Sequence, residues 1–398
     1  MRLKSAFSFL PLFASIYAIT PLAVDMYLPA MPQMADSFST GISEVQWSLS
    51  IFLAGYALGM LCFGPMADHY GRKVFLLGGL SGFLVTTLAL AFAPDIQTFI
   101  TLRFFQALFG GAATVVVPGT IRDLFGKSTA KGMSYVSMAM MIAPMLAPTI
   151  GSIILAWSEW QAIFMILTSY AALILFFAIF RFPFLPARSQ SHSNVIYSVF
   201  RSYRIVLLNT SCLPFLLTTM LTTFVFFTYI TSVSFVYITI YGVSEQVFGI
   251  LFGANVAALM LGNLINARLV NRFSPIQMLR MGLLSASIVT LFLTWILIHQ
   301  ASIAYLIVSI FALMASLIIV STNSDALVLI SFPRQSGTAT AVIGSLKFGG
   351  GAFSGLILSW LYDGSAAPVA LVIGSAVTII ILLHLAIRLF KLPIPGTN

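Results

Sequence analysis

The sequence predicts an all-α polytopic membrane protein, with twelve transmembrane helices in two pseudo-symmetric bundles of six. Two properties of the 398-residue chain point to this fold class: 60% of its residues are hydrophobic, and only 7% are charged. Its mean hydropathy is +1.04. A soluble protein of this length needs far more charged residues to cover its surface, whereas a lipid bilayer accepts an apolar exterior.

The apolar residues gather into segments of the right length. One bilayer crossing takes about 20 apolar residues, and twelve such segments follow one another. The first is too long for the core of a signal peptide, so we expect it to remain in the mature protein. The expected spans are 7–30, 46–65, 74–93, 98–120, 132–156, 161–180, 207–232, 246–266, 277–298, 303–324, 337–360 and 367–387.

The positions of the cations give the topology. Of the 19 Lys and Arg residues, 16 fall in the termini and the even-numbered loops, and Arg280 falls in the first turn of the span that follows one of these loops. Arg103 and Lys347 fall deeper inside spans. Cytoplasmic loops are enriched in Lys and Arg, so both termini are predicted to be cytoplasmic. The net charge of +9 therefore reports topology, and no nucleic-acid partner is expected.

The longest polar interval divides the spans six and six. It gives an N-terminal bundle over residues 1–180, a cytoplasmic linker over 181–206 and a C-terminal bundle over 207–398. Alternating-access transporters use two such duplicated halves, with the substrate site near the middle of the membrane. The four histidines are scattered and no phosphate-binding loop occurs, so an enzyme is not expected. Cys62 and Cys212 lack the spacing of a metal site.

Five motifs carry a family resemblance. In order along the chain they are Val-Asp-Met-Tyr-Leu-Pro-Ala-Met-Pro at 24–32, Gly-Pro-Met-Ala-Asp-His-Tyr-Gly-Arg-Lys at 64–73, Leu-Arg-Phe-Phe-Gln-Ala-Leu-Phe-Gly at 102–110, Ala-Pro-Met-Leu-Ala-Pro-Thr-Ile-Gly at 143–151 and Leu-Lys-Phe-Gly at 346–349. Together they resemble the Bcr/CflA group, in the twelve-helix drug:proton antiporter branch of the major facilitator superfamily.

The resemblance implies a proton-coupled exporter of small amphipathic drug-like compounds, of the phenicol, bicyclomycin or sulfonamide type. Such a protein works by alternating access as a monomer in the bacterial inner membrane. Its energy source is the proton gradient, and no cofactor is expected. A proton-coupled transporter of a metabolite such as a sugar or a nucleoside is the alternative, because the same fold serves both.

Charged residues inside spans are the first candidates for function, because burying a charge in a bilayer costs at least about 2.5–3.5 kcal/mol. Asp25 lies near the end of span 1 and Arg103 near the start of span 4, each roughly 7–8 Å below the outer surface at about 1.5 Å per residue. Asp25 is predicted to carry the proton while Arg103 tunes it. The alternative is a permanent ion pair that only fixes helices. Lys347 either contacts substrate or the other half, or snorkels to the cytoplasmic side.

The segment 64–73 is read as a polar turn between spans 2 and 3. Gly64 permits close helix approach and Gly71 permits the turn. Asp68 could meet a helix N-terminus or a cation such as Arg72 or Arg122, and the resemblance makes this contact a latch of the outward-facing state. The alternative is a soluble turn whose cations set the topology.

The remaining candidates lie within the spans. In span 5, Pro144 and Pro148 remove backbone donors and Gly151 allows tight packing, which predicts a bend beside the interface of the halves. Asp325 is expected in a cytoplasmic loop. Aromatic and neutral polar side chains suit a neutral amphipathic compound, although helix packing is the alternative for each. The candidate substrate contacts are Tyr27, Met141, Thr222, Phe226, Tyr229, Asn255, Asn323 and Lys347.

Overall fold

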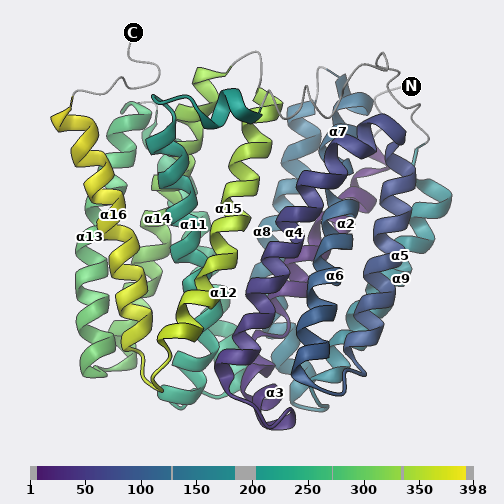
Figure 1. Cartoon of the computed structure of the whole chain (residues 1–398), viewed down its shortest axis with the longest axis horizontal. Coiled ribbons are helices and arrows are strands. Elements are labelled where there is room, and N and C mark those ends of the chain that lie inside the picture. Colours follow the sequence, from purple (N-terminus) through teal and green to yellow (C-terminus); the bar gives the residue numbers. More distant parts are fainter. Residues whose placement is uncertain (1–6, 127–128, 184–202, 271, 333–335, 391–398) are drawn as a thin grey trace. The chain divides into compact units, whose positions relative to one another are not determined.

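The computed structural model describes residues 7–126, 129–183, 203–270, 272–332 and 336–390, in which all regular structure is helical (Figure 1). The chain forms two compact units. The first comprises Met1–Val195 with Val243–Gly253, and the second comprises Ile196–Gly242 with Ala254–Asn398. Most of the predicted linker, residues 184–202, lies outside the described residues.

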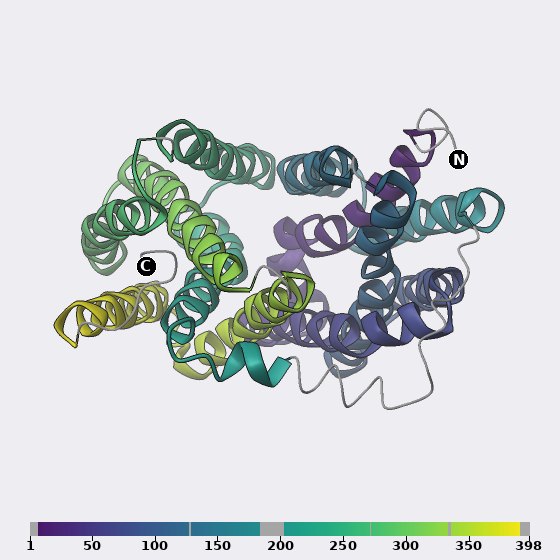
Figure 2. The ribbon, with the colours of Figure 1, turned by 90° about the horizontal axis from the view of Figure 1, so that it is seen from above.

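The first unit is a bundle in which α4 and α5 pack against α6, α5 also packs against α9, and α2 packs against α8. Within each unit the long helices run side by side and are seen end-on in Figure 2. The elements of the first unit are α2 (Leu10–Asp25), a 3₁₀ turn (Leu28–Ala30), α3 (Met31–Ser37), α4 (Ile42–Tyr70), α5 (Arg72–Leu90), α6 (Ile96–Thr114), α7 (Val116–Phe125), α8 (Thr129–Leu155) and α9 (Gln161–Arg181).

The second unit centres on α11, which packs against α14, α15 and α16, while α13 packs against α14 and α16. Buried apolar residues such as Phe215, Leu279, Val320 and Ile380 fill its core. Its elements are α11 (Leu213–Ser234), a π-helical turn (Phe235–Ile240), α12 (Glu245–Leu269, whose start belongs to the first unit), α13 (Pro275–His299), α14 (Ile303–Ser331), α15 (Ser336–Leu361) and α16 (Ala367–Leu389).

The helices have the length and composition of membrane spans. Eleven in the described part are long and apolar enough to cross a bilayer, and α8 supplies a shorter apolar stretch, Ile142–Leu155. Large apolar side chains such as Trp360 and Phe180 lie on the outside, where lipid solvates them. The prediction of an all-α polytopic membrane protein is therefore confirmed.

Three local predictions need correction. The first span does not run unbroken to residue 30, because α2 ends at Asp25 and the chain continues through the 3₁₀ turn to Ser37. The prolines at 29 and 32 lack the backbone donors that a continuous helix needs. The polar turn at 64–73 is mostly helix, since α4 continues to Tyr70 and only Gly71, at φ 107°, interrupts it. Asp325 lies inside α14 rather than in a loop.

Candidate functional site

Arg103 is fully buried in the middle of the first unit. Helix α6 carries it about two turns after the N-cap Asp95, whose side chain accepts a hydrogen bond from the backbone of Thr98. The Arg103 Nη1 atom donates to the Ala23 carbonyl at 3.1 Å and to Gln106 Oε1 at 2.6 Å. These neutral oxygens compensate part of the buried charge.

Aromatic rings and a hydrogen-bond chain complete this environment. The Arg103 guanidinium lies over the ring of Tyr27, at 4.4 Å, and over that of Phe52, at 4.3 Å. Both rings stabilise the cation through their π faces. Gln106 Nε2 in turn donates to Thr87 Oγ1 at 2.8 Å. Residues from α2 to α6 thus hold Arg103 in place, and the fully buried Tyr27 serves this packing rather than an open substrate surface.

Asp25 lies beside this cluster without joining it. Its side chain is buried at the end of α2, and its Oδ1 atom has no hydrogen-bond partner among the described residues. Arg103 reaches the carbonyl of Ala23, two residues before Asp25, but the two charged groups form no ion pair within 4.0 Å in the described part of the chain. The permanent ion pair offered as an alternative is therefore absent from this conformation. The apolar helical stretch that contains Asp25 also continues to Ser37, further than the sequence suggested.

Gly151 packs α8 against the break that follows Asp25. A Cβ atom at Gly151 would overlap the Met26 carbonyl and lie 3.3 Å from Pro29 Cγ. Only glycine allows this approach of two backbones. Pro144 and Pro148 lie inside α8, which is assigned as one helix through both positions, and the side chain of the predicted Met141 lies outside the described residues.

The motif at 64–73 contains an ion pair that the sequence did not identify. Arg72 Nη1 contacts Asp123 Oδ2 at 2.7 Å, which joins the start of α5 to α7. Gly119, one turn before Asp123, leaves space for the Arg72 guanidinium, because a Cβ at Gly119 would lie 2.6 Å from Arg72 Cζ. The sequence signal for this ion pair was Asp123, the acidic residue directly after the predicted cation Arg122.

The other residues of this motif have separate places. A Cβ atom at Gly64 would lie 3.3 Å from Val115 Cγ2, so α4 does approach its neighbour closely there. Arg122 is largely exposed, with its Nε atom 3.6 Å from the adjacent Asp123. The Asp68 side chain lies outside the described residues, so its predicted contacts remain a prediction.

Most of the predicted substrate contacts in the second unit are engaged in bonds between or within helices. Asn255 Nδ2 donates to Tyr229 Oη at 2.7 Å, and Asn323 Nδ2 donates to Asn266 Oδ1 at 2.5 Å. Thr222 is buried and donates to a carbonyl of its own helix. Phe226 is half-buried and packs edge-on against Phe227. These contacts fit the packing alternative better than an open binding surface.

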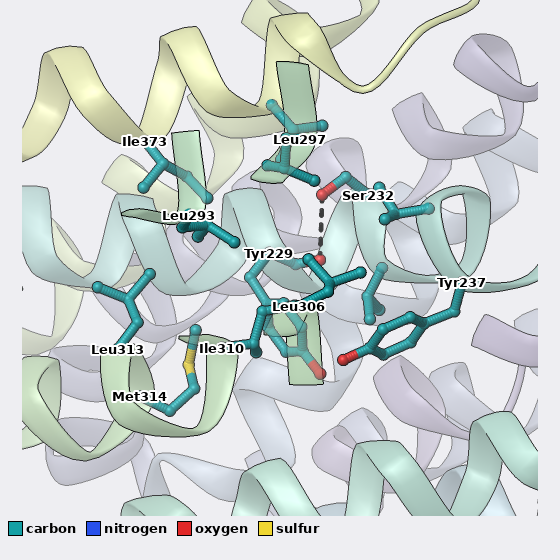
Figure 3. A pocket seen from close by; sticks show the side chains of 13 residues that line it. Tyr229, Ser232, Tyr237, Leu293, Leu297, Leu306, Ile310, Leu313, Met314 and Ile373 are labelled. Atoms are coloured by element: carbon teal, nitrogen blue, oxygen red, sulfur yellow. Dashed lines mark hydrogen bonds between the residues drawn. The ribbon is translucent and has the colours of Figure 1, made fainter. Parts of the chain in front are cut away.

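A small cavity of about 20 Å³ lies among α11, the π-helical turn after it, α13, α14 and α16 of the second unit (Figure 3). Tyr229, Ser232 and Tyr237 bring the polar atoms of its lining, but Ser232 Oγ already donates to backbone carbonyls of α11. The rest of the lining is apolar: Val233, Val236, Leu293, Leu297, Leu306, Ile310, Leu313, Met314, Val369 and Ile373. With so few free polar groups, this cavity suits a small apolar group.

Lys347 forms an ion pair with a residue that was expected elsewhere. Its Nζ atom lies 2.5 Å from Oδ2 of Asp325 on α14. Thr219 Oγ1 on α11 donates to Oδ1 of the same carboxylate at 2.6 Å. Lys347 therefore does not snorkel in this structure, because its ammonium is held between helices of its own unit.

Comparison with known proteins gives consistent matches over the whole chain. Residues 13–355 match the Major Facilitator Superfamily. The chain is 28% identical to the "Bicyclomycin resistance protein homolog" of Haemophilus influenzae over 382 residues, 96% of each protein. It is 30% identical to the "Chloramphenicol resistance protein" of Pseudomonas aeruginosa over 387 residues, covering 91% of this chain and 86% of that one.

Solved structures agree in fold. The xylose transporter XylE from E. coli, in a partially occluded inward open conformation, superposes with a TM-score of 0.75 at 14% identity and covers 99% of both chains. A peptide transporter POT superposes with a TM-score of 0.76 at 14% identity, covering 99% of this chain and 96% of that one. These identities are too low to carry substrate or mechanism from one protein to the other.

Proposed function

Because this chain belongs to the major facilitator superfamily, we propose that it exports small amphipathic antibiotics of the phenicol, bicyclomycin or sulfonamide type in exchange for protons. The resemblance to the Bcr/CflA drug-efflux group is confirmed by relatives named for bicyclomycin and chloramphenicol resistance. They cover nearly the whole chain, whereas the sugar and nucleoside transporters among the structural neighbours share only the fold.

The observation that carries proton coupling is the buried carboxyl of Asp25 beside the buried Arg103, since its Oδ1 atom has no hydrogen-bond partner among the described residues. An ionised carboxylate without a partner is expensive in a low-dielectric interior, so this environment favours the neutral, proton-bound form of Asp25. Arg103 is meanwhile partly compensated by the Ala23 carbonyl, Gln106 and two aromatic rings, while its Nε and Nη2 atoms have no hydrogen-bond partner among the described residues. Asp25 releases its proton in a conformation that brings Arg103 or water to its carboxylate.

Gly151 links this site to conformational change. It allows α8 to touch the backbone directly after Asp25, so a movement of α8 alters the surroundings of the carboxyl. In the same region Ser152 Oγ donates to the Glu245 carbonyl at 2.7 Å, at the start of α12. The Arg72–Asp123 pair holds α5 to α7 and acts as a latch for one state of the cycle, together with Asp68, Gly71 and Arg122.

The proposed exporter is a monomer in the bacterial inner membrane. The charge pattern supports a topology with both termini in the cytoplasm, since cations concentrate in cytoplasmic loops. The residue ranges 1–180, 181–206 and 207–398 then form an N-terminal bundle, a linker and a C-terminal bundle. The proton gradient supplies the energy, and the cycle involves no cofactor and no enzymatic step.

The test is chloramphenicol transport by purified protein in proteoliposomes under an imposed pH gradient. In Asp25→Asn we expect transport to stop responding to the gradient, because the amide carries no exchangeable proton, while downhill exchange persists. Asp36→Asn is the matched control, since Asp36 is an exposed carboxylate in α3. Transport by Asp25→Asn that still follows the pH gradient would contradict the assignment of Asp25, and a wild-type protein that moves none of the three antibiotic classes would contradict drug export.

A further inference from the structure

The second unit contains an ionic site that the proton mechanism does not use. Asp325 on α14 and Lys347 on α15 form an ion pair at 2.5 Å, with side chains 24% and 26% exposed. An ion pair inside a membrane domain costs desolvation energy, and a pair that only joined helices could be replaced by apolar residues at little loss. A pair in this partly open position can also form bonds to a ligand.

The hydrogen bonds of the pair are asymmetric. Both oxygens of Asp325 accept, one from Lys347 and the other from Thr219 Oγ1 at 2.6 Å. The Lys347 ammonium has three donors, yet within the described residues Asp325 is its only hydrogen-bond partner. Both oxygens of the carboxylate are therefore bonded, while the ammonium keeps donors available for another acceptor.

The pair faces away from the lipid side of its helices. At about 100° per residue, Asp325 lies roughly a right angle or more from Tyr305, Val308 and Ile330, the large exposed apolar residues of α14. On α15, Lys347 lies well over 90° by the same count from Phe353 and Trp360, the two most exposed apolar residues of that helix. The partial exposure of the pair is thus toward a side that lipid does not solvate.

Open space lies one helical turn before Lys347 on that side. A Cβ atom at Gly344, one turn before Lys347, would meet nothing within 4 Å among the described atoms. Residues three apart in a helix are neighbours on one face, so this space borders Lys347 itself. Gly349 also has open space around it, but it lies one turn before Phe353 and shares the lipid-facing side.

We propose that Asp325 and Lys347 form a polar anchor for the exported compound, in which Lys347 donates to a neutral acceptor such as a nitro, sulfonyl or amide oxygen lying beside Gly344. This inference rests on the proposed drug export. The pair has no net charge, so a neutral acceptor leaves the charges balanced, whereas an anion competes with Asp325 and a cation competes with Lys347. The anchor therefore selects neutral dipolar compounds over charged analogues.

Charge selectivity provides the main test. Three probes share one scaffold: chloramphenicol is neutral, chloramphenicol base carries an ammonium, and chloramphenicol succinate carries a carboxylate. Binding of each to purified protein in detergent is measured by calorimetry. The wild type is expected to prefer chloramphenicol. Asp325→Asn leaves an uncompensated ammonium and shifts preference toward the succinate by about tenfold or more, and Lys347→Gln shifts preference toward the base by a similar factor.

The double variant separates an anchor from a helix-fixing pair. Asp325→Asn/Lys347→Gln has no unpaired charge, so its thermal unfolding midpoint should return toward that of the wild type. Its chloramphenicol affinity should remain weakened by about tenfold, because the amide that replaces Lys347 is shorter and uncharged. Full recovery of affinity together with stability would overturn the anchor.

A steric test uses the two open glycines. Gly344→Leu fills the space beside Lys347 and should weaken chloramphenicol binding at least about tenfold, while the unfolding midpoint stays at or above that of the wild type. Gly349→Leu makes the same change on the lipid-facing side and should leave binding within about twofold. Equal effects of the two substitutions on binding would overturn the anchor, and so would an unchanged probe preference in the charge variants. In either case, transport of chloramphenicol by the wild type would still support drug export. No binding or transport of chloramphenicol by the wild type would contradict both proposals.

Discussion

The latch between α5 and α7 can be tested by a substitution that leaves both charged residues in place. Gly119 lies beside the guanidinium of Arg72, and a Cβ atom there would lie 2.6 Å from Cζ and 2.7 Å from Nη2. The ordinary contact between such atoms is about 3.5 Å, so Gly119→Ala requires the guanidinium to withdraw by roughly 0.9 Å. The Arg72–Asp123 bond of 2.7 Å must then lengthen, or α7 must move away from α5.

The energetic effect follows from the burial of the pair. The Arg72 side chain is 7% exposed and that of Asp123 is 23% exposed, so the bond is neither fully screened nor fully desolvated. A charge-assisted hydrogen bond contributes about 1.5–3 kcal/mol, and we expect Gly119→Ala to remove about 2 kcal/mol of it. That is roughly a thirtyfold change in the equilibrium between latched and unlatched forms.

A double-mutant cycle isolates this effect. Unfolding free energies in mixed micelles and chloramphenicol transport rates are measured for Gly119→Ala, Asp123→Asn and the double variant. Because both single changes disrupt the same bond, Gly119→Ala should cost little once Asp123 is neutral. Gly78→Ala makes the same chemical change on α5, where nothing lies within 4 Å in the described structure, and should be neutral or slightly stabilising. Equal costs of Gly119→Ala in both backgrounds would refute the latch geometry.

Three further outcomes are expected. Gly151→Ala should lower both stability and transport, because its Cβ would overlap the Met26 carbonyl, and a backbone group cannot move aside as a flexible side chain would. The measurements are unfolding midpoints and transport rates, with Gly78→Ala as the control. Gln106→Leu should cost about 1–3 kcal/mol of unfolding free energy, because it removes the acceptor at 2.6 Å from the buried Arg103, and wild-type stability would contradict the role of Gln106. Hydrogen bonds from Thr98 lower the pKa of the exposed Asp95, so this carboxylate stabilises the fold above its unfolded-state pKa and loses that effect as pH falls through the lowered value. Asp95→Ala should therefore lower the unfolding midpoint at pH 7, and its difference from the wild type should shrink progressively as the pH falls below the unfolded-state pKa of the carboxylate. A difference that did not shrink in acid would contradict the charge-based explanation.

The sequence predicted the fold well, because solvation by lipid requires an apolar composition in every span. Runs of apolar residues and the confinement of Lys and Arg to one set of loops depend on the bilayer, so they can be seen without tertiary contacts. Local breaks were harder to predict. Pro29 and Pro32 marked the interruption after Asp25, but nothing local showed that the chain would resume as a helix to Ser37.

The site was predictable in its residue types and less so in its pairings. Asp25 and Arg103 could be chosen because a charge inside a span is costly anywhere. The partners of Arg103 could not be predicted. One of them, the Ala23 carbonyl, is 80 residues away, and a backbone carbonyl carries no sequence signal. Asp123 was missed for a related reason: a carboxylate near the end of a predicted span looks like an ordinary loop residue until α7 brings it to Arg72.

The two acids within membrane-spanning helices show where sequence reasoning reaches its limit. Asp25 and Asp325 are the same residue type, and both lie within helices that can cross the membrane. Asp25 has an unpartnered oxygen in the described structure, which suits a group that gains and loses a proton. Asp325 is bonded by Lys347, 22 residues away, and by Thr219, 106 residues away, which suits a fixed charge. The roles proposed for them differ because of contacts between helices, which only the folded chain shows.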